Sequence, residues 1–151
     1  MAALTNSDVP TQRATSAGGI VFRDGDGGPE ILIGRRRGER ARVTWSLPKG
    51  TPERAETTEQ TALREVHEET GLEMRIVDTV GDIHYRFTRD GIRIDKTVHY
   101  FLMEPTGGDI ADHDHEFEEV RWVPLAEADR LMSFQTERDV VTKALTLAGL
   151  D

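Results

Sequence analysis

The chain of 151 residues contains no cysteine, which excludes a disulfide framework and a metal site built on thiolates. It has no apolar run near the roughly 20 residues that a membrane-spanning helix needs, and residues 1–16 lack the basic-then-apolar order of a secretory signal. Lys and Arg number 19 against 28 Asp and Glu, a formal net charge of −9. So acidic a chain repels a phosphate backbone, and general nucleic-acid binding is not expected. These absences fit a cytoplasmic protein without a membrane partner.

What the sequence does contain is enough apolar material for one folded domain. With an apolar fraction of 36%, we expect a single domain over residues 14–151 after a flexible tail over residues 1–13. Hydrophobic patterning predicts strands over residues 14–23, 30–35, 45–47, 74–77, 83–88, 92–102 and 120–123, a loop over 104–115, and terminal helices over 124–132 and 134–148. The order predicts an α/β fold with a mixed sheet sandwiched between helices.

The stretch 47–72 holds the most informative local signals. Thr57 and Gln60 form a capping box that predicts the start of a helix, and Gly71 is typical of a left-handed helix end. At about 100° per residue, one side of this helix is expected to be buried. The residues on that side are Ala62, Leu63, Val66 and Thr70.

Three carboxylates, those of Glu65, Glu68 and Glu69, fall together on the neighbouring side of this helix. Acidic groups this close raise one another's pKa values, and a solvated helix face would intersperse Lys or Arg. A bound divalent cation is the simplest reason to keep them together. Oxygen ligands favour Mg²⁺ or Mn²⁺ over zinc. Because Mg²⁺ is usually completed by substrate phosphates, the pattern also predicts a phosphate-bearing small-molecule ligand.

These residues belong to a longer pattern that resembles the complete Nudix box. The pattern is Gly50, five residues, Glu56, seven residues, Arg64-Glu65-Val66, one residue, Glu68-Glu69, one residue, and Gly71-Leu72. The resemblance implies the Nudix fold over roughly residues 15–149. It also implies Mg²⁺- or Mn²⁺-dependent hydrolysis of a nucleoside diphosphate linked to another group, by attack of a metal-activated water.

The resemblance also implies roles for the box residues. Glu65 and Glu69 would ligate the metal, Glu68 would ligate metal or take the proton of the attacking water, Glu56 and the Gly50 loop would support the metal shell, and Arg64 would orient the carboxylates. The sequence departs from the family at one place. Members often carry Pro-Gly directly before the first box glutamate, where this chain has Arg54 and Ala55. The departure puts the geometry of that turn in question and leaves the ligands intact.

Substrate contacts are suggested by two short stretches, of which the first resembles hydrolases of dinucleoside polyphosphates or diphosphoinositol polyphosphates and the second resembles hydrolases of dinucleoside polyphosphates. In Leu47-Pro48-Lys49-Gly50 and Lys96-Thr97-Val98-His99-Tyr100, the lysines would face phosphate. The alternative for Lys96 is a side chain that snorkels at a strand end.

Aromatic and arginine side chains are the other candidates for substrate contacts. Tyr85 is the preferred candidate for stacking on a base, at about 1–3 kcal/mol, and Tyr100 is the second choice. The alternative is that both tyrosines are core or rim residues. Arg35 and Arg37, in the basic run 35–37, are candidates for phosphate contact or for a solvated hairpin end.

A further acid is expected from the region after residue 115, where the family often supplies one more glutamate. Glu116 is our candidate for an extra metal ligand or the general base, with Glu119 as the alternative and an ordinary surface acid as the third reading. His113 and His115 stand at alternate positions, but we do not predict zinc there, because no thiol or third histidine is close in sequence.

Three functions follow, and all depend on the resemblance. The first is a pyrophosphohydrolase of dinucleoside polyphosphates such as diadenosine tetraphosphate. The second keeps the chemistry but changes the substrate: a MutT-like nucleoside triphosphatase, a diphosphoinositol polyphosphate phosphohydrolase or a decapping-like enzyme. The third is a nucleotide-sensing module without catalysis, which the intact set of box glutamates disfavours. The sequence leaves the oligomeric state and the number of metals open.

Overall fold

The computed structural model describes residues 10–151. The expected N-terminal tail therefore lies largely outside the described residues. Its last part, Thr11–Arg13, is not a tail, because it pairs with Arg93–Asp95 and begins the first strand three residues earlier than predicted. The β-strands are β1 (Thr11–Gly25), β2 (Gly28–Arg37), β3 (Val43–Ser46), β4 (Lys49–Gly50), β5 (Leu72–Arg89), β6 (Ile92–Gly108) and β7 (Glu119–Pro124). The α-helices are α1 (Thr58–Thr70), α2 (Leu125–Leu131) and α3 (Gln135–Ala148), and short 3-10 turns cover Glu39–Ala41 and Ile110–Asp112.

The strands form one mixed sheet. Its main order is β3-β2-β1-β6-β5, with β4 paired to β1 and β7 paired to β2. β1 and β6 run parallel, whereas the other pairs are antiparallel. The predicted α/β fold with a mixed sheet is confirmed. None of the helices in residues 10–151 has the length and apolar character to cross a bilayer.

Helices cover both faces of this sheet, and alternation along β1 shows how. Ala17 and Val21 pack in one cluster with Val66 of α1, whereas Ile20 packs in a second cluster with Val140 of α3. Successive side chains of a strand point to opposite faces, so α1 and α3 lie on opposite sides of β1. The sheet is sandwiched as predicted.

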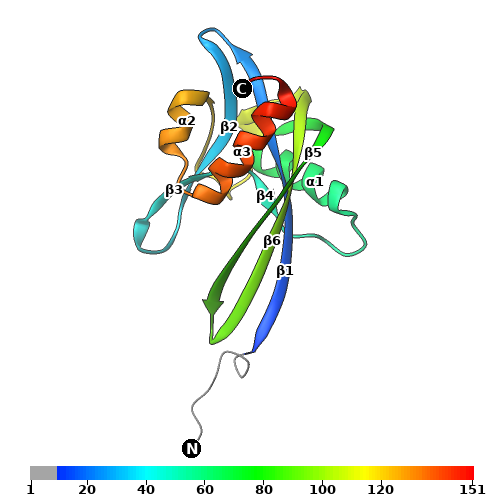
Figure 1. Cartoon of the computed structure of the whole chain (residues 1–151), viewed down its shortest axis with the longest axis vertical. Coiled ribbons are helices and arrows are strands. Elements are labelled where there is room, and N and C mark those ends of the chain that lie inside the picture. Colours follow the sequence, from blue (N-terminus) through cyan, green and yellow to red (C-terminus); the bar gives the residue numbers. More distant parts are fainter. Residues whose placement is uncertain (1–9) are drawn as a thin grey trace, which may run out of the picture.

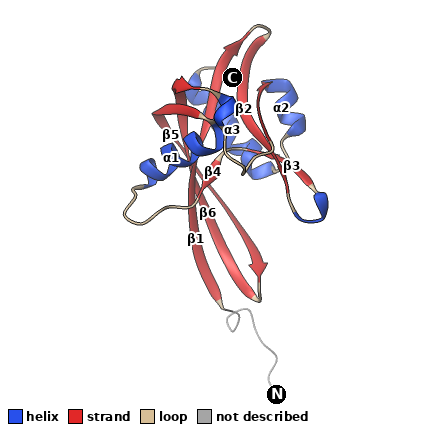
Figure 2. Cartoon of the chain, turned by 180° about the vertical axis from the view of Figure 1, so that it is seen from behind, coloured by secondary structure: helices blue, strands red, loops and turns tan. Residues whose placement is uncertain are grey.

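A three-stranded tongue extends beyond this helical body (Figures 1 and 2). It consists of the first part of β1, the end of β5 and the start of β6, which pair from Thr11↔Arg93 and Arg89↔Ile92 onward. A tight hairpin turn joins β5 to β6: Asp90 and Gly91 have φ of 52° and 75°, as the right-handed twist of such a hairpin favours.

Two predicted boundaries around β5 and β6 were wrong. The segments expected as separate strands at 74–77 and 83–88 are one strand with register shifts, because β5 pairs with β6 along its whole length. The loop expected from residue 104 is strand as far as Gly108, since that part of β6 pairs with Leu72–Arg75.

The helix signals were more reliable. The Thr57–Gln60 capping box is present, and Gly71 ends α1 with a φ of 80°. Pro124 is the cap of α2, one position before the helical start that we predicted for it. On α3 the apolar Leu147 has an exposed fraction of 45%, while the buried side includes an acid, Glu137, at 2%.

Candidate active site

The carboxylates are presented by a helix whose two ends are fixed locally. α1 starts at the capping box and ends in the left-handed Gly71, so its third and fourth turns are held in one position. Glu65 and Glu69 are one turn apart and reach the same hollow, of about 280 Å³. We call it the site hollow; its lining residues are Ser16, Arg36, Lys49, Gly50, Thr51, Glu65, Glu69, Lys96 and Glu116.

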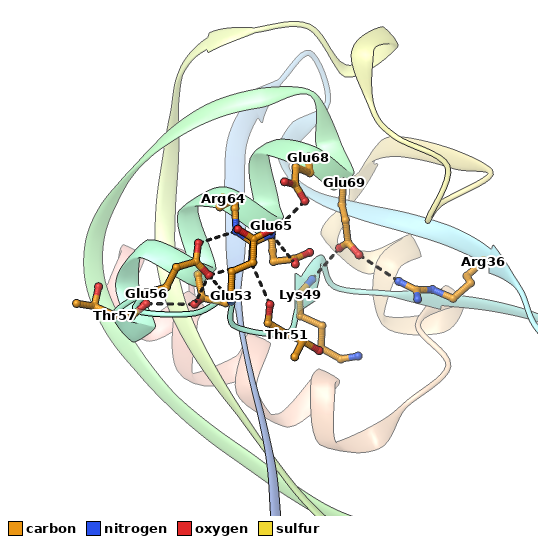
Figure 3. Close-up of polar contacts among 11 residues, drawn as sticks. Arg36, Lys49, Thr51, Glu53, Glu56, Thr57, Arg64, Glu65, Glu68 and Glu69 are labelled. Carbon is orange, nitrogen blue, oxygen red and sulfur yellow. Dashed lines mark hydrogen bonds and ion pairs between the residues drawn. The ribbon is translucent and has the colours of Figure 1, made fainter. Parts of the chain in front are cut away.

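Glu69 is the most buried of these acids, with an exposed fraction of 2%. One oxygen accepts the Lys49 backbone N–H at 2.8 Å, and the other lies 3.4 Å from a guanidinium nitrogen of Arg36 (Figure 3). Burial nevertheless dominates over both contacts and raises the pKa of Glu69 to about 8. Burial also raises the pKa of Glu65.

Gly50 is required beside Glu65 for a steric reason. A Cβ added to Gly50 would collide with the carboxylate of Glu65, so a larger residue would have to displace that carboxylate from its place in the site. Lys49 and Gly50 form β4 and pair with Gly18 and Ala17 of β1, which sets the loop against the sheet. The box glycine is therefore a packing requirement of the site.

Arg64 ties the box acids together, as the resemblance implied. Its Nε and one terminal nitrogen bind Glu56 at 2.6 and 2.9 Å, and the other terminal nitrogen binds Glu65 at 2.8 Å and Glu68 at 3.2 Å. A further bond of 2.9 Å reaches the carbonyl oxygen of Thr51 (Figure 3). These bonds lower the pKa of Glu56 to about 2. The planar guanidinium group of an arginine can bind several carboxylates in this way far better than the ammonium group of a lysine can.

The turn that departs from the family keeps its geometry. The Glu56 N–H donates to the Glu53 carbonyl, and Ala55 at the third position has a φ of 67°. A four-residue turn with positive φ there is the type that favours Pro at the second position and Gly at the third. The chain thus adopts the conformation of Pro-Gly with Arg54 and Ala55, at the cost of a strained alanine.

Within the basic run 35–37, the named candidates were Arg35 and Arg37, whereas the arginine that reaches the carboxylates of the site is Arg36. It binds Glu116 at 3.2 Å and approaches Glu69, and its guanidinium lies 5.0 Å above the ring centre of Phe117. The two predicted arginines, Arg35 and Arg37, instead bind Glu118, two residues after Glu116, at 3.3 and 2.8 Å. Alternation along β2 separates Arg36 from its two neighbours.

Glu116 lines the site hollow, whereas the alternative, Glu119, pairs with Arg35 and Arg121. The loop before Glu116 is docked on α1, because the Asp114 N–H donates to the Glu68 carbonyl at 2.9 Å.

His113, directly before Asp114, belongs to the same docked loop. Its Nδ1 lies 2.6 Å from the Asp114 carbonyl oxygen. His115 lines a neighbouring hollow with Arg37.

Lys49 and Lys96 both line the site hollow, and each also lines a second hollow. Lys49 lines an apolar hollow of about 260 Å³, with Ile83, Tyr85, Phe134, Thr136 and Glu137. Lys96 lines a tongue hollow of about 470 Å³, with Arg13, Ala14, Thr15, His84, Tyr85, Arg86, Asp95 and Thr97. Burial lowers the pKa of Lys96, and the nearby charges of Lys49 and Arg89 lower it further.

Tyr85 borders both outer hollows, is 36% exposed and stacks on Phe87 with ring centres 6.0 Å apart. Tyr100 is fully buried in the core and offers no ring face to a ligand.

A divalent cation fits the chemistry of the donors. Among residues 10–151, no three acidic or histidine side chains stand close enough to hold a metal ion as they are. Arg64 and Arg36 draw the carboxylates toward themselves. Yet Glu65, Glu69 and Glu116 line one hollow with Gly50, and carboxylate and carbonyl oxygens are the ligands that Mg²⁺ and Mn²⁺ prefer.

Comparison with known proteins agrees with this geometry. A family model, the NUDIX domain, matches residues 12–145. The chain belongs to the Nudix family. The protein named MutT4 from Mycobacterium tuberculosis is 48% identical over an alignment of 135 residues. The alignment covers 85% of this chain and 53% of that protein. The chain thus spans about half the length of this relative.

Solved structures show the same fold. A NUDIX hydrolase from Nitrosomonas europaea matches with a TM-score of 0.74 and 16% identity, over 89% of this chain and 90% of that one. An Ap4A hydrolase from C. elegans matches with a TM-score of 0.68 and 20% identity, over 90% and 98%.

Proposed function

We propose that this chain is a Mg²⁺- or Mn²⁺-dependent pyrophosphohydrolase whose substrates are dinucleoside polyphosphates such as diadenosine tetraphosphate. The observation that supports the proposal is a set of three adjoining hollows. The site hollow meets the apolar hollow at Lys49 and the tongue hollow at Lys96. A dinucleoside polyphosphate has the same three parts: a polyphosphate between two nucleosides.

The positive side chains that line the site hollow suit such a ligand. The chain carries a net charge of −9, yet Arg36, Lys49 and Lys96 all face the site hollow. Cations that line an acidic site neutralise a polyphosphate locally where the overall field would repel it. The aromatic rings of Tyr85 and Phe134 border the outer hollows and can hold a base by stacking.

The reaction is substitution at phosphorus. Oxygen of water bonds to phosphorus, the bridging P–O bond breaks, and the departing nucleotide takes the electron pair as a phosphate oxygen. The cation, when bound by Glu65, Glu69 and the Gly50 carbonyl, supplies Lewis acidity and charge neutralisation. Glu68, 45% exposed, or Glu116, 59% exposed, accepts the proton of the water. Lys49, Lys96 and Arg36 hold the non-reacting phosphates.

A substrate panel with Mg²⁺ in ¹⁸O-labelled water tests this function. We expect turnover of diadenosine tetraphosphate, with the label identifying the attacked phosphorus. Lys96→Ala should raise KM for the dinucleotide by about tenfold through loss of one phosphate contact. Lys143→Ala removes an exposed lysine on α3 and is the matched control. Turnover confined to nucleoside triphosphates would exclude the dinucleotide substrate.

A second candidate is a MutT-like nucleoside triphosphate pyrophosphohydrolase, which the 48% identity to MutT4 favours. It predicts release of inorganic pyrophosphate and a nucleoside monophosphate from triphosphates. Tight nucleotide binding without any hydrolysis in Mn²⁺ would instead favour a sensing module.

A further inference from the structure

The segment that carries Lys49 and Gly50 has an edge bound by side chains instead of a strand. The Trp45 N–H donates to the Ser133 hydroxyl at 2.9 Å, the Leu47 N–H to Glu137 at 2.9 Å, and the Lys49 N–H to Glu69 at 2.8 Å. Alternate amides of an extended chain point to the same side, so these three donors define one edge of the segment. Two of the three acceptors belong to the C-terminal part of the chain.

The opposite edge of the segment is held by the sheet. Trp45 pairs with Arg35 of β2, the Pro48 carbonyl accepts the Gly19 N–H at 3.2 Å, and Lys49 pairs with Gly18 of β1. With both edges occupied, the backbone from residue 45 to residue 50 has little freedom to shift. Its position decides where the Lys49 amide meets Glu69 and where Gly50 passes Glu65.

Glu137 is an unusual choice for a buried position. It lies in the first turn of α3, is 2% exposed, and its neighbours on that helix are the buried Val140, Val141 and Ala144. Taking a carboxyl group out of water is unfavourable unless it is hydrogen-bonded, and burial raises the pKa of this one. The bond to the Leu47 amide crosses 90 residues of sequence and joins α3 to the box loop.

We propose that Glu137 is a positioning residue of the active site: by holding the Leu47 amide, it fixes the loop that presents the Lys49 amide and Gly50 to the box carboxylates. Its kinetic consequence rests on the proposed function, whereas its structural consequence does not. Glu137 also lines the apolar hollow beside Lys49, so it connects that hollow to the carboxylates.

The experiment compares three variants by amide hydrogen exchange of the metal-free protein and by steady-state kinetics. Glu137→Gln keeps an acceptor oxygen at the same reach, whereas Glu137→Met keeps the length and removes the acceptor. Val140→Ala is the control, because it loosens the same helix at a 2% exposed position and leaves the carboxylate that accepts the Leu47 N–H unchanged. Melting temperatures of all variants separate loss of position from loss of stability.

We expect Glu137→Met to lower the exchange protection of the Leu47 and Lys49 amides by about tenfold or more and kcat by about 10²-fold, as a small misplacement at a reacting centre does. KM should change little. Glu137→Gln should restore both protection and kcat, and Val140→Ala should affect neither beyond its change in global stability.

Three results would overturn the proposal. The first is a Leu47 amide that exchanges freely in the unmodified protein, and the second is an equal loss of amide protection and kcat in Glu137→Gln and Glu137→Met. The third is a full kcat in Glu137→Met although its amide protection is lost. Should the Met variant not fold, Glu137→Asp takes its place, since it keeps the acid and withdraws it from the amide. If the unmodified protein cleaves no nucleotide, the proposed function fails, and the exchange measurements still decide the role of Glu137.

Discussion

The burial of Glu69 predicts that metal binding depends steeply on pH. Its pKa of about 8 results chiefly from desolvation, which the Lys49 amide and the Arg36 charge only partly offset and which Glu65 reinforces. A cation binds the ionised carboxylate, so below pH 8 it must displace a proton. At pH 6.5 about 3% of Glu69 is ionised and at pH 8.5 about three quarters, so the affinity should rise about 25-fold, or ~1.9 kcal/mol.

Stability without metal should change in the opposite direction. The folded protein keeps the Glu69 proton to a higher pH than the unfolded chain does, so between pH 4.5 and 8 the native state binds more protons. The contribution of Glu69 is therefore full below pH 4.5 and is lost as pH rises through 8, by up to about 1.4 kcal/mol per pH unit. Saturating Mg²⁺ should offset this loss, because the cation replaces the proton as the partner of the carboxylate.

Isothermal titration with Mn²⁺ in two buffers of different ionisation enthalpy measures the affinity for the cation and the number of protons released when it binds. We expect nearly one proton released at pH 6.5 and almost none at pH 9.5. Glu69→Gln should weaken binding and remove the part of the pH dependence that Glu69 contributes. An affinity that is constant from pH 6.5 to 8.5, with no proton release, would show that the cation does not use Glu69 or that burial does not raise its pKa.

Three substitutions test the local geometry. Ala55→Gly should stabilise the protein by about 0.5–1 kcal/mol in urea unfolding, because relief of a left-handed alanine exceeds the entropy lost to glycine; destabilisation would mean that the turn is not strained. Arg64→Lys should lower kcat by about 10–100-fold, with little effect if the fork around Glu56 is unimportant. Gly34→Ala should destabilise by about 1–3 kcal/mol, since its Cβ would enter the Phe117 ring; an unchanged melting temperature would contradict that contact.

The box was predictable from sequence because its structure is local. The cap at Thr57, the left-handed Gly71 and the spacing of Glu65 and Glu69 all lie within one helix and its ends. Local hydrogen bonds and a 3.6-residue period fix such features with no knowledge of the rest of the chain. Even the contact of Arg64 with Glu68 follows from a separation of four residues.

The residues that were missed depend on contacts between distant segments. Arg36 reaches the site because β2 pairs with β3 on one side and with β7 on the other, whereas the sequence alone did not show which arginine of the run 35–37 would do so. Alternation was the signal that separates them, but the preceding run Ile31–Ile33 is buried throughout and hides the period. The role of Glu137 was not visible in the sequence for a different reason. An acid in the first turn of a helix is ordinary, since the helix dipole favours it there.

The cations of the site explain how the carboxylates coexist in a chain of net charge −9. Arg64 binds Glu56 and Glu65 through short bonds, whereas Arg36 approaches Glu69 only at 3.4 Å. An incoming cation therefore competes most easily with Arg36 for the Glu69 oxygen. Once displaced, that guanidinium stays at the hollow, where a phosphate is the complementary partner. Metal and polyphosphate should then strengthen each other's binding, because each relieves a charge that the other leaves unpaired.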